Sequence, residues 1–154
     1  MNLAVWLKET SKPHQWKVRD EVRTDPTMLR VRPHLVLGNG TILSVQASIG
    51  HYCSPRSNEG SWTHVEAWVI KDNQTNRSAL VEYENDYGDP LGYVPLETIE
   101  QFIRDNGGYA GTCDWTLEGE RFFICAFCDT KTIVPASYQG FYHCPARLGN
   151  NPNE

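Results

Sequence analysis

The chain has 154 residues, 40% of them hydrophobic, and a formal net charge of -5 at pH 7. This length supports one domain with a core, or one domain with a small added module, and the apolar content excludes a disordered chain. The negative charge disfavours sequence-independent binding of nucleic acids, because such binding needs a basic surface.

A hairpin is the first element that the sequence predicts. Its two apolar, β-branched runs cover residues 31–37 and 41–47, and the glycines of Gly38-Asn39-Gly40 suit the turn between them. Residues 63–70 predict a third strand by the same criteria, and residues 78–84 a weaker fourth.

An amphipathic helix should follow Pro95, which suits a first helical turn. Apolar residues recur there at helical spacing and end before two glycines: Leu96, Ile99, Phe102, Ile103, Gly107 and Gly108. After residue 110 the pattern returns to short strands and turns. We therefore expect an α+β fold, an antiparallel sheet with one packed helix. It would comprise an N-terminal extension (1–28), an α+β domain (29–109), a cysteine-rich β module (110–148) and a disordered tail (149–154).

Three stretches in the middle of the chain carry a resemblance to a known group of proteins. "LSVQASIGHYCSPR", "THVEAWV" and "GYVPLETIEQFIRDNGG" resemble segments of short bacteriophage proteins, over roughly residues 29–107. The resemblance implies a viral origin and the host cytoplasm, and it carries no activity and no site. No run approaches the ~20 apolar residues of a membrane helix, and the N-terminus lacks the pattern of a secretory signal.

The C-terminal cysteines predict a metal site. Cys125 and Cys128 have the Cys-x-x-Cys spacing that lets two thiolates reach one tetrahedral ion. Cys113 and Cys144 are the expected completing pair, with His143 as an alternative to Cys144, and the bound zinc would be structural. The alternatives are buried, reduced thiols and a redox pair, which the strand-like run after Cys128 disfavours.

A second motif would give the zinc an enzymatic role. Base deaminases combine His-x-Glu with a later Cys-x-x-Cys, and this chain has His64 and Glu66 before Cys125 and Cys128. The context differs, because both motifs open helices in deaminases whereas His64 lies in a predicted strand.

The loop after residue 50 is the other polar cluster. His51, Tyr52 and Arg56 would suit an anion or nucleotide pocket, with the Arg56 guanidinium as a bidentate donor. The alternative is a structural loop with solvated polar groups.

An acidic segment predicts a partner surface. Residues 79–101 contain six acids and no base, and four of these acids form the candidate patch: Glu82, Glu84, Asp86 and Asp89. Such a patch would attract a host protein with a basic surface, although a solvated face is the alternative. We therefore expect a non-enzymatic, phage-encoded interaction protein that binds and modulates a host macromolecule. A small zinc-dependent enzyme on nucleotides or bases, or a nucleotide-binding protein, is the alternative.

Overall fold

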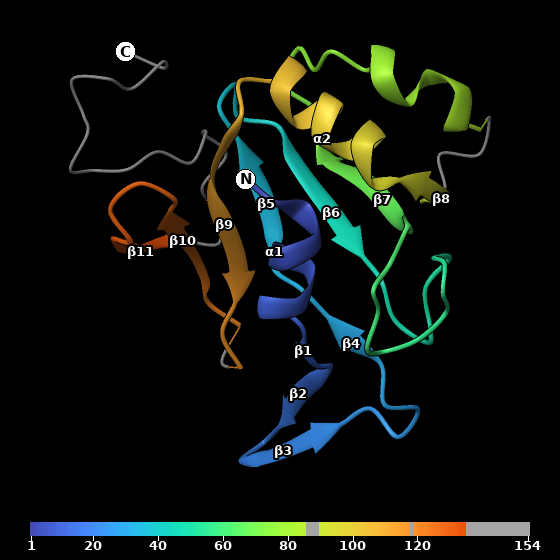
Figure 1. The fold of residues 1–154 in the computed structure, drawn as a ribbon. Helices are drawn as coiled ribbons and strands as arrows, with labels where there is room; N and C mark the ends of the chain where they lie inside the picture. The colour runs from blue at the N-terminus through green and yellow to red at the C-terminus, as the bar shows by residue number, and fades with distance from the viewer. Residues whose placement is uncertain (86–89, 118, 135–154) are drawn as a thin grey trace.

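The computed structural model describes residues 1–85, 90–117 and 119–134, and a curved sheet lies at its centre (Figure 1). Within these residues the sheet has seven strands in the order β11-β10-β9-β5-β6-β7-β8, and each adjacent pair is antiparallel. The predicted α+β class is confirmed. The strands are β5 (His34–Leu37), β6 (Ile42–Gln46), β7 (His64–Lys71), β8 (Leu91–Pro95), β9 (Tyr109–Trp115), β10 (Arg121–Cys125) and β11 (Lys131–Val134).

The first hairpin forms as the sequence predicts. Its turn closes with a hydrogen bond of 2.9 Å from Leu37 N to Thr41 O, and Gly40 takes a φ of 94° that favours glycine. β7 confirms the predicted third strand.

Helix α2 (Leu96–Asp105) confirms the predicted amphipathic helix, and its buried side chains are Ile99, Phe102 and Ile103. Asn106 closes it, because its Nδ2 donates to Phe102 O at 2.8 Å. The same amide accepts from Asn39 Nδ2 at 2.9 Å, which ties the helix end to the hairpin turn.

The predicted fourth strand is wrong. This segment forms a 3-10 helix, η1 (Ser78–Tyr83), with Leu80 fully buried and Val81 65% exposed. β7 already pairs with β6 and β8, so neither of its edges is open to another strand. The segment instead packs against α2, where a tight turn buries a single leucine.

A helix that the sequence did not predict, α1 (Leu3–Glu9), covers the same face of the sheet as α2 (Figure 1). Leu3, Trp6 and Leu7 enter the main core, together with residues of β5 to β8 and α2. The first residues of the predicted N-terminal extension therefore contribute to the core.

A second, smaller core lies on the opposite face of the sheet. Val36 alternates along β5 with Leu35 and Leu37, which point to the helices. β9 pairs with both β5 and β10, so the sheet continues across the boundary that we expected near residue 110. The members of this cluster are Val36, Ile42, Cys113, Phe123, Cys125 and Val134.

A two-stranded ribbon projects from the lower end of the body in Figure 1. It consists of β2 (Gln15–Val18) and β3 (Glu21–Thr24). The short pair β1 (Lys12–Pro13) and β4 (Arg30–Val31) forms its base. No helix of the described residues is long and apolar enough to cross a membrane.

Candidate functional site

The ribbon is exposed on both of its faces. Every residue of β2 and β3 is exposed, and Trp16, Val18 and Val22 leave 39%, 42% and 48% of their surface to solvent. At the base, Arg30 donates to Ser11 Oγ at 3.0 Å and to Ser11 O at 2.9 Å, which holds the ribbon on the body. The ribbon is therefore anchored at one end and contributes no side chain to either core.

A cleft of about 560 Å³ separates the ribbon from the end of β9. Trp16 lies on one side of it, and Trp115 and Leu117, which are 53% and 43% exposed, lie on the other. An ion pair between Lys12 and Asp114 links the two sides. The Trp16 ring lies beside the His14 ring, with 5.4 Å between centroids. We call Trp16, Trp115 and Leu117, with the space between them, the aromatic cleft.

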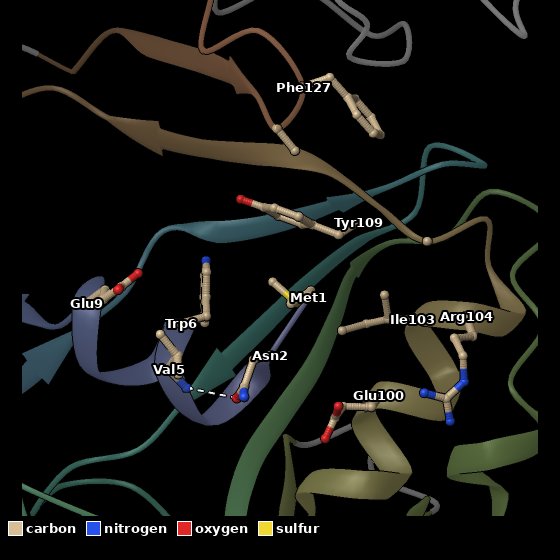
Figure 2. Close-up of a pocket in the computed structure, with 12 residues that line it drawn as sticks. Met1, Asn2, Val5, Trp6, Glu9, Glu100, Ile103, Arg104, Tyr109 and Phe127 are labelled. Carbon is tan, nitrogen blue, oxygen red and sulfur yellow. Dashed lines mark hydrogen bonds between the residues drawn. The ribbon is translucent and has the colours of Figure 1, made fainter.

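A second concave site of about 530 Å³ lies between α1, α2 and the turn after β10 (Figure 2). Its lining includes Met1, Trp6, Ile103 and Tyr109, together with Val5 and Phe127, which are 47% and 67% exposed. Burial raises the pKa of the Tyr109 phenol. We call this site the interhelical hollow.

The polar loop brings its three predicted residues together, mainly through contacts with one another. Arg56 Nε donates to His51 O at 3.1 Å, and its guanidinium carbon lies 5.3 Å from the centroid of the Tyr52 ring. His51 Nδ1 lies 2.7 Å from Ser48 Oγ. Burial lowers the pKa of His51, whereas the Glu66 carboxylate acts in the opposite direction. An anion or nucleotide pocket at this loop stays a prediction.

His64 and Glu66 lie on β7, far from the Cys-x-x-Cys motif. Glu66 Oε2 accepts a hydrogen bond of 3.0 Å from Tyr52 N, and His64 Nδ1 lies 2.8 Å from Thr63 Oγ1. β6, β5 and β9 lie between β7 and β10 in the sheet. At the usual spacing of neighbouring strands, β7 and β10 are therefore about 19 Å apart. The structure therefore does not bring the two halves of the deaminase-like motif together.

Two of the predicted zinc ligands lie on one face of the sheet. Cys113 pairs with Phe123, and Cys125 follows Phe123 by two residues, so the two cysteines are diagonal neighbours in the second core. Burial raises the pKa of Cys113 to about 12. Phe127 N donates to Cys125 Sγ at 3.4 Å, within the turn that leads to the exposed Cys128.

No group of three ligands that could hold a metal occurs among the described residues. Cys144 and its alternative His143 lie outside the described residues. The zinc site thus stays a prediction.

Protein purified without chelator is expected to contain about one zinc per chain, because a closed four-ligand site binds the ion as part of folding. Cys125→Ser should lose the metal, since it removes one thiolate of the Cys-x-x-Cys pair. Cys53→Ser is the matched control, because Cys53 is equally buried but lies outside the ligand set. Elemental analysis measures both variants. Folded wild-type protein free of zinc would contradict the site.

Within the described residues, the acidic segment begins in η1, at the opposite end of the molecule from the ribbon (Figure 1). Glu82 and Glu84 are exposed, and Glu84 Oε1 accepts from Arg77 at 3.4 Å. Arg77 also pairs with Asp72 at 2.9 Å, so a base reduces the negative charge here. Asp86 and Asp89 lie outside the described residues. The acidic partner surface stays a prediction.

The aromatic cleft and the interhelical hollow were missed, although both had a sequence signal. "QWKV" and "EVRT" are two strand-like runs separated by two residues, the spacing of a tight hairpin. Asn2 precedes apolar residues at helical spacing, and its side chain indeed caps α1 by accepting from Val5 N at 3.2 Å. The ribbon and α1 could thus be predicted from the sequence, whereas the residues that face them across each site could not.

Comparison with protein-family models, with curated proteins and with solved structures found no match for this chain.

Proposed function

We propose that this chain is a non-enzymatic interaction protein of bacteriophage origin that binds and modulates a host protein. The observation that carries the proposal is the exposed ribbon, with Trp16 facing Trp115 and Leu117 across the aromatic cleft. The acidic segment would be a second contact surface.

The ribbon has no role in the hydrophobic core that would explain its apolar side chains. A two-stranded hairpin without a covering layer is only marginally stable in water, and this ribbon nevertheless exposes a tryptophan and two valines. Tryptophan is among the side chains that contribute most at protein interfaces, because it buries a large area with little loss of conformational entropy. A partner that covers the ribbon would remove this apolar surface from water.

A protein partner fits this surface better than a nucleic acid does. Lys12 is paired with Asp114 across the cleft, and Arg23 is paired with Glu21 along the ribbon at 3.3 Å. These pairs reduce the positive charge that the ribbon offers to phosphates, and the chain as a whole is acidic. Aromatic and aliphatic side chains therefore dominate the recognition.

The enzymatic alternative receives no support from the geometry. His64 and Glu66 do not meet Cys125 and Cys128, because three strands lie between the strands that carry them. We therefore do not propose nucleotide or base chemistry.

Trp16→Ala should weaken capture of the host partner at least about tenfold, because a central interface tryptophan commonly contributes more than about 2 kcal/mol. Trp68→Ala is the matched control, since Trp68 on β7 is 48% exposed and lies away from the ribbon. The measurement is capture of proteins from host lysate on immobilised wild-type chain and on each variant, followed by titration of the proteins identified.

The proposal requires a protein that is lost with Trp16→Ala and retained with Trp68→Ala. Equal capture by the three chains would overturn the assignment of the interface to the ribbon. Circular dichroism of the variants shows whether a loss comes from unfolding instead.

A further inference from the structure

The outer edge of the ribbon is open among the residues that the structure describes. β3 pairs with β2 alone, and it is the outermost strand at the lower end of the molecule in Figure 1. The edge formed by β2 differs, because Gln15 and Lys17 line the aromatic cleft. We call the side of β3 that faces away from β2 the ribbon edge. The N–H and C=O groups of such an edge can pair with a further strand.

The hydrogen bonds of the ribbon show which backbone groups point outward. Asp25 N donates to His14 O at 2.9 Å, one residue beyond the paired residues of β2 and β3. In an antiparallel ladder, hydrogen-bonded pairs alternate with pairs that are not hydrogen-bonded. Val22 and Thr24 lie three positions and one position before Asp25, so each belongs to a pair that is not hydrogen-bonded. Their N–H and C=O groups therefore point away from β2, along the ribbon edge.

The side chains of the ribbon edge are self-complementary. If two copies of β3 pair antiparallel with their Val22 residues opposite each other, Glu21 of each copy lies opposite Arg23 of the other. Both charged side chains extend into solvent, with 69% and 53% of their surface exposed, and they already pair at 3.3 Å on one face of the ribbon. In this register Val22 forms the hydrogen-bonded pair, and the charged residues form the pairs whose side chains approach most closely. Four charges of alternating sign would thus meet around the two-fold axis.

We infer that the chain forms a homodimer in which the ribbon edge of one copy pairs with the ribbon edge of a second copy. Each Val22 N–H donates to the Val22 C=O of the other copy, and Glu21 and Arg23 form two ion pairs between the copies. The two ribbons thereby become one antiparallel sheet of four strands. Because a lone hairpin is only marginally stable in water, this pairing stabilises the ribbon. The interface is the same patch on both copies, as in most dimers with two-fold symmetry.

The dimer leaves the Trp16 side of the ribbon open. Trp16 lies opposite Arg23 in the ribbon, so the two side chains are on the same face. The two-fold axis of an antiparallel strand pair runs perpendicular to the sheet, and the Trp16 rings of both copies therefore lie on one face of the dimer. The aromatic surface is thus presented twice, which increases the avidity for a partner with two matching sites. The pairing itself does not depend on a host partner.

The dimer should be weak, because a strand of four residues buries little surface at its edge. We expect a dissociation constant above about 1 μM, weaker than that of many interfaces of standard size. Sedimentation equilibrium of the full-length chain, whose mass is 17.5 kDa, measures this constant over a concentration series. A wild-type chain that remains monomeric at about 1 mM would overturn the inference.

Reversal of the edge charges tests the register. Glu21→Arg places like charges opposite each other twice and should weaken the dimer at least about tenfold, as should Arg23→Glu. The double variant restores two ion pairs and should dimerise like the wild type. An equimolar mixture of the single variants should form heterodimers, since one edge is then basic and the other acidic. Glu82→Arg is the matched control, because Glu82 is exposed on η1, at the opposite end of the molecule, and its reversal changes the net charge equally.

Val22→Pro tests the backbone pairing separately. It removes the outward N–H, and the ribbon tolerates it because this N–H does not bond to β2. Val22→Pro should abolish the dimer, whereas Val22→Thr, which keeps the N–H and the β-branched shape, should leave it unchanged. A wild-type dimer that Glu21→Arg and Val22→Pro both leave intact forms through another surface, and the inference is then overturned. It is also overturned if neither the double variant nor the mixture recovers the dimer.

Discussion

Gly38→Ala should lower the free energy of unfolding by about 3 kcal/mol, the upper end of the usual cost of overpacking. A Cβ at this position would lie 2.2 Å from Gly107 O and 2.7 Å from Gly107 C. Both atoms are backbone, so no side-chain rotation can relieve the clash. The hairpin turn and the end of α2 would have to separate, which would also strain the hydrogen bond of 2.9 Å from Gly38 N to Gly108 O.

Gly108→Ala is the matched control on the other side of this contact. Gly108 has a φ of 79°, and nothing lies within 4 Å of the Cβ that the substitution would add. Its cost is therefore only that of a left-handed alanine, about 1 kcal/mol. Urea unfolding of both variants measures the difference. Equal losses would mean that the close approach at Gly38 relaxes without cost.

The parts of the fold that could be predicted are those with local signals. The turn at Gly40 and the apolar spacing from Leu96 to Ile103 specify their elements within a dozen residues, and both elements form as predicted. The segment around Leu80 shows the limit of this approach. Its apolar and β-branched residues suit a strand, but β7 has both of its edges occupied, and the sequence does not show this.

The candidate sites depend on contacts that sequence spacing cannot reveal. Trp16 and Trp115 are 99 positions apart in the sequence and meet only because the ribbon base lies beside β9, where Lys12 pairs with Asp114. The interhelical hollow likewise forms only because α1 lies beside Tyr109 and the turn that carries Phe127. The cysteines, the acidic segment and the polar loop could be selected from the sequence as candidate sites, because each is a cluster of unusual composition within a short stretch.

The most unusual group in the core is Arg32, which the sequence analysis did not select. The residue is 3% exposed, and among the described residues no carboxylate pairs with it. Its Nε donates to Leu7 O and its Nη1 to Ala47 O, both at 2.7 Å, and its guanidinium carbon lies 4.9 Å from the centroid of the Trp62 ring. Burial lowers the pKa of Arg32 to about 10, so the side chain is still charged at pH 7. Backbone carbonyls and an aromatic ring thus replace the usual counter-ion.

This arrangement makes Arg32 the link between α1 and the sheet. Leu7 belongs to α1, whereas Ala47 directly follows β6. α1 has only seven residues, too few for a stable isolated helix. The side chain of Arg32 therefore contributes to holding one wall of the interhelical hollow in place.

Arg32→Ala should lower the free energy of unfolding by about 3 kcal/mol, because two buried carbonyls lose their donor and the long side chain leaves a void. Removing a desolvated charge offsets part of this loss. Arg32→Met separates the two effects, since it refills most of the void but donates no hydrogen bond, and it should recover only part of the stability. Arg23→Ala, on the exposed ribbon, should change stability by less than about 0.5 kcal/mol.

Amide hydrogen exchange on Arg32→Ala should show faster exchange in α1 than in α2, because the link to α1 is lost directly. The outcome that would contradict this role has two parts: Arg32→Ala raises the amide exchange rate equally in both helices, and Arg32→Met is as stable as the wild type. The side chain would then act through packing alone.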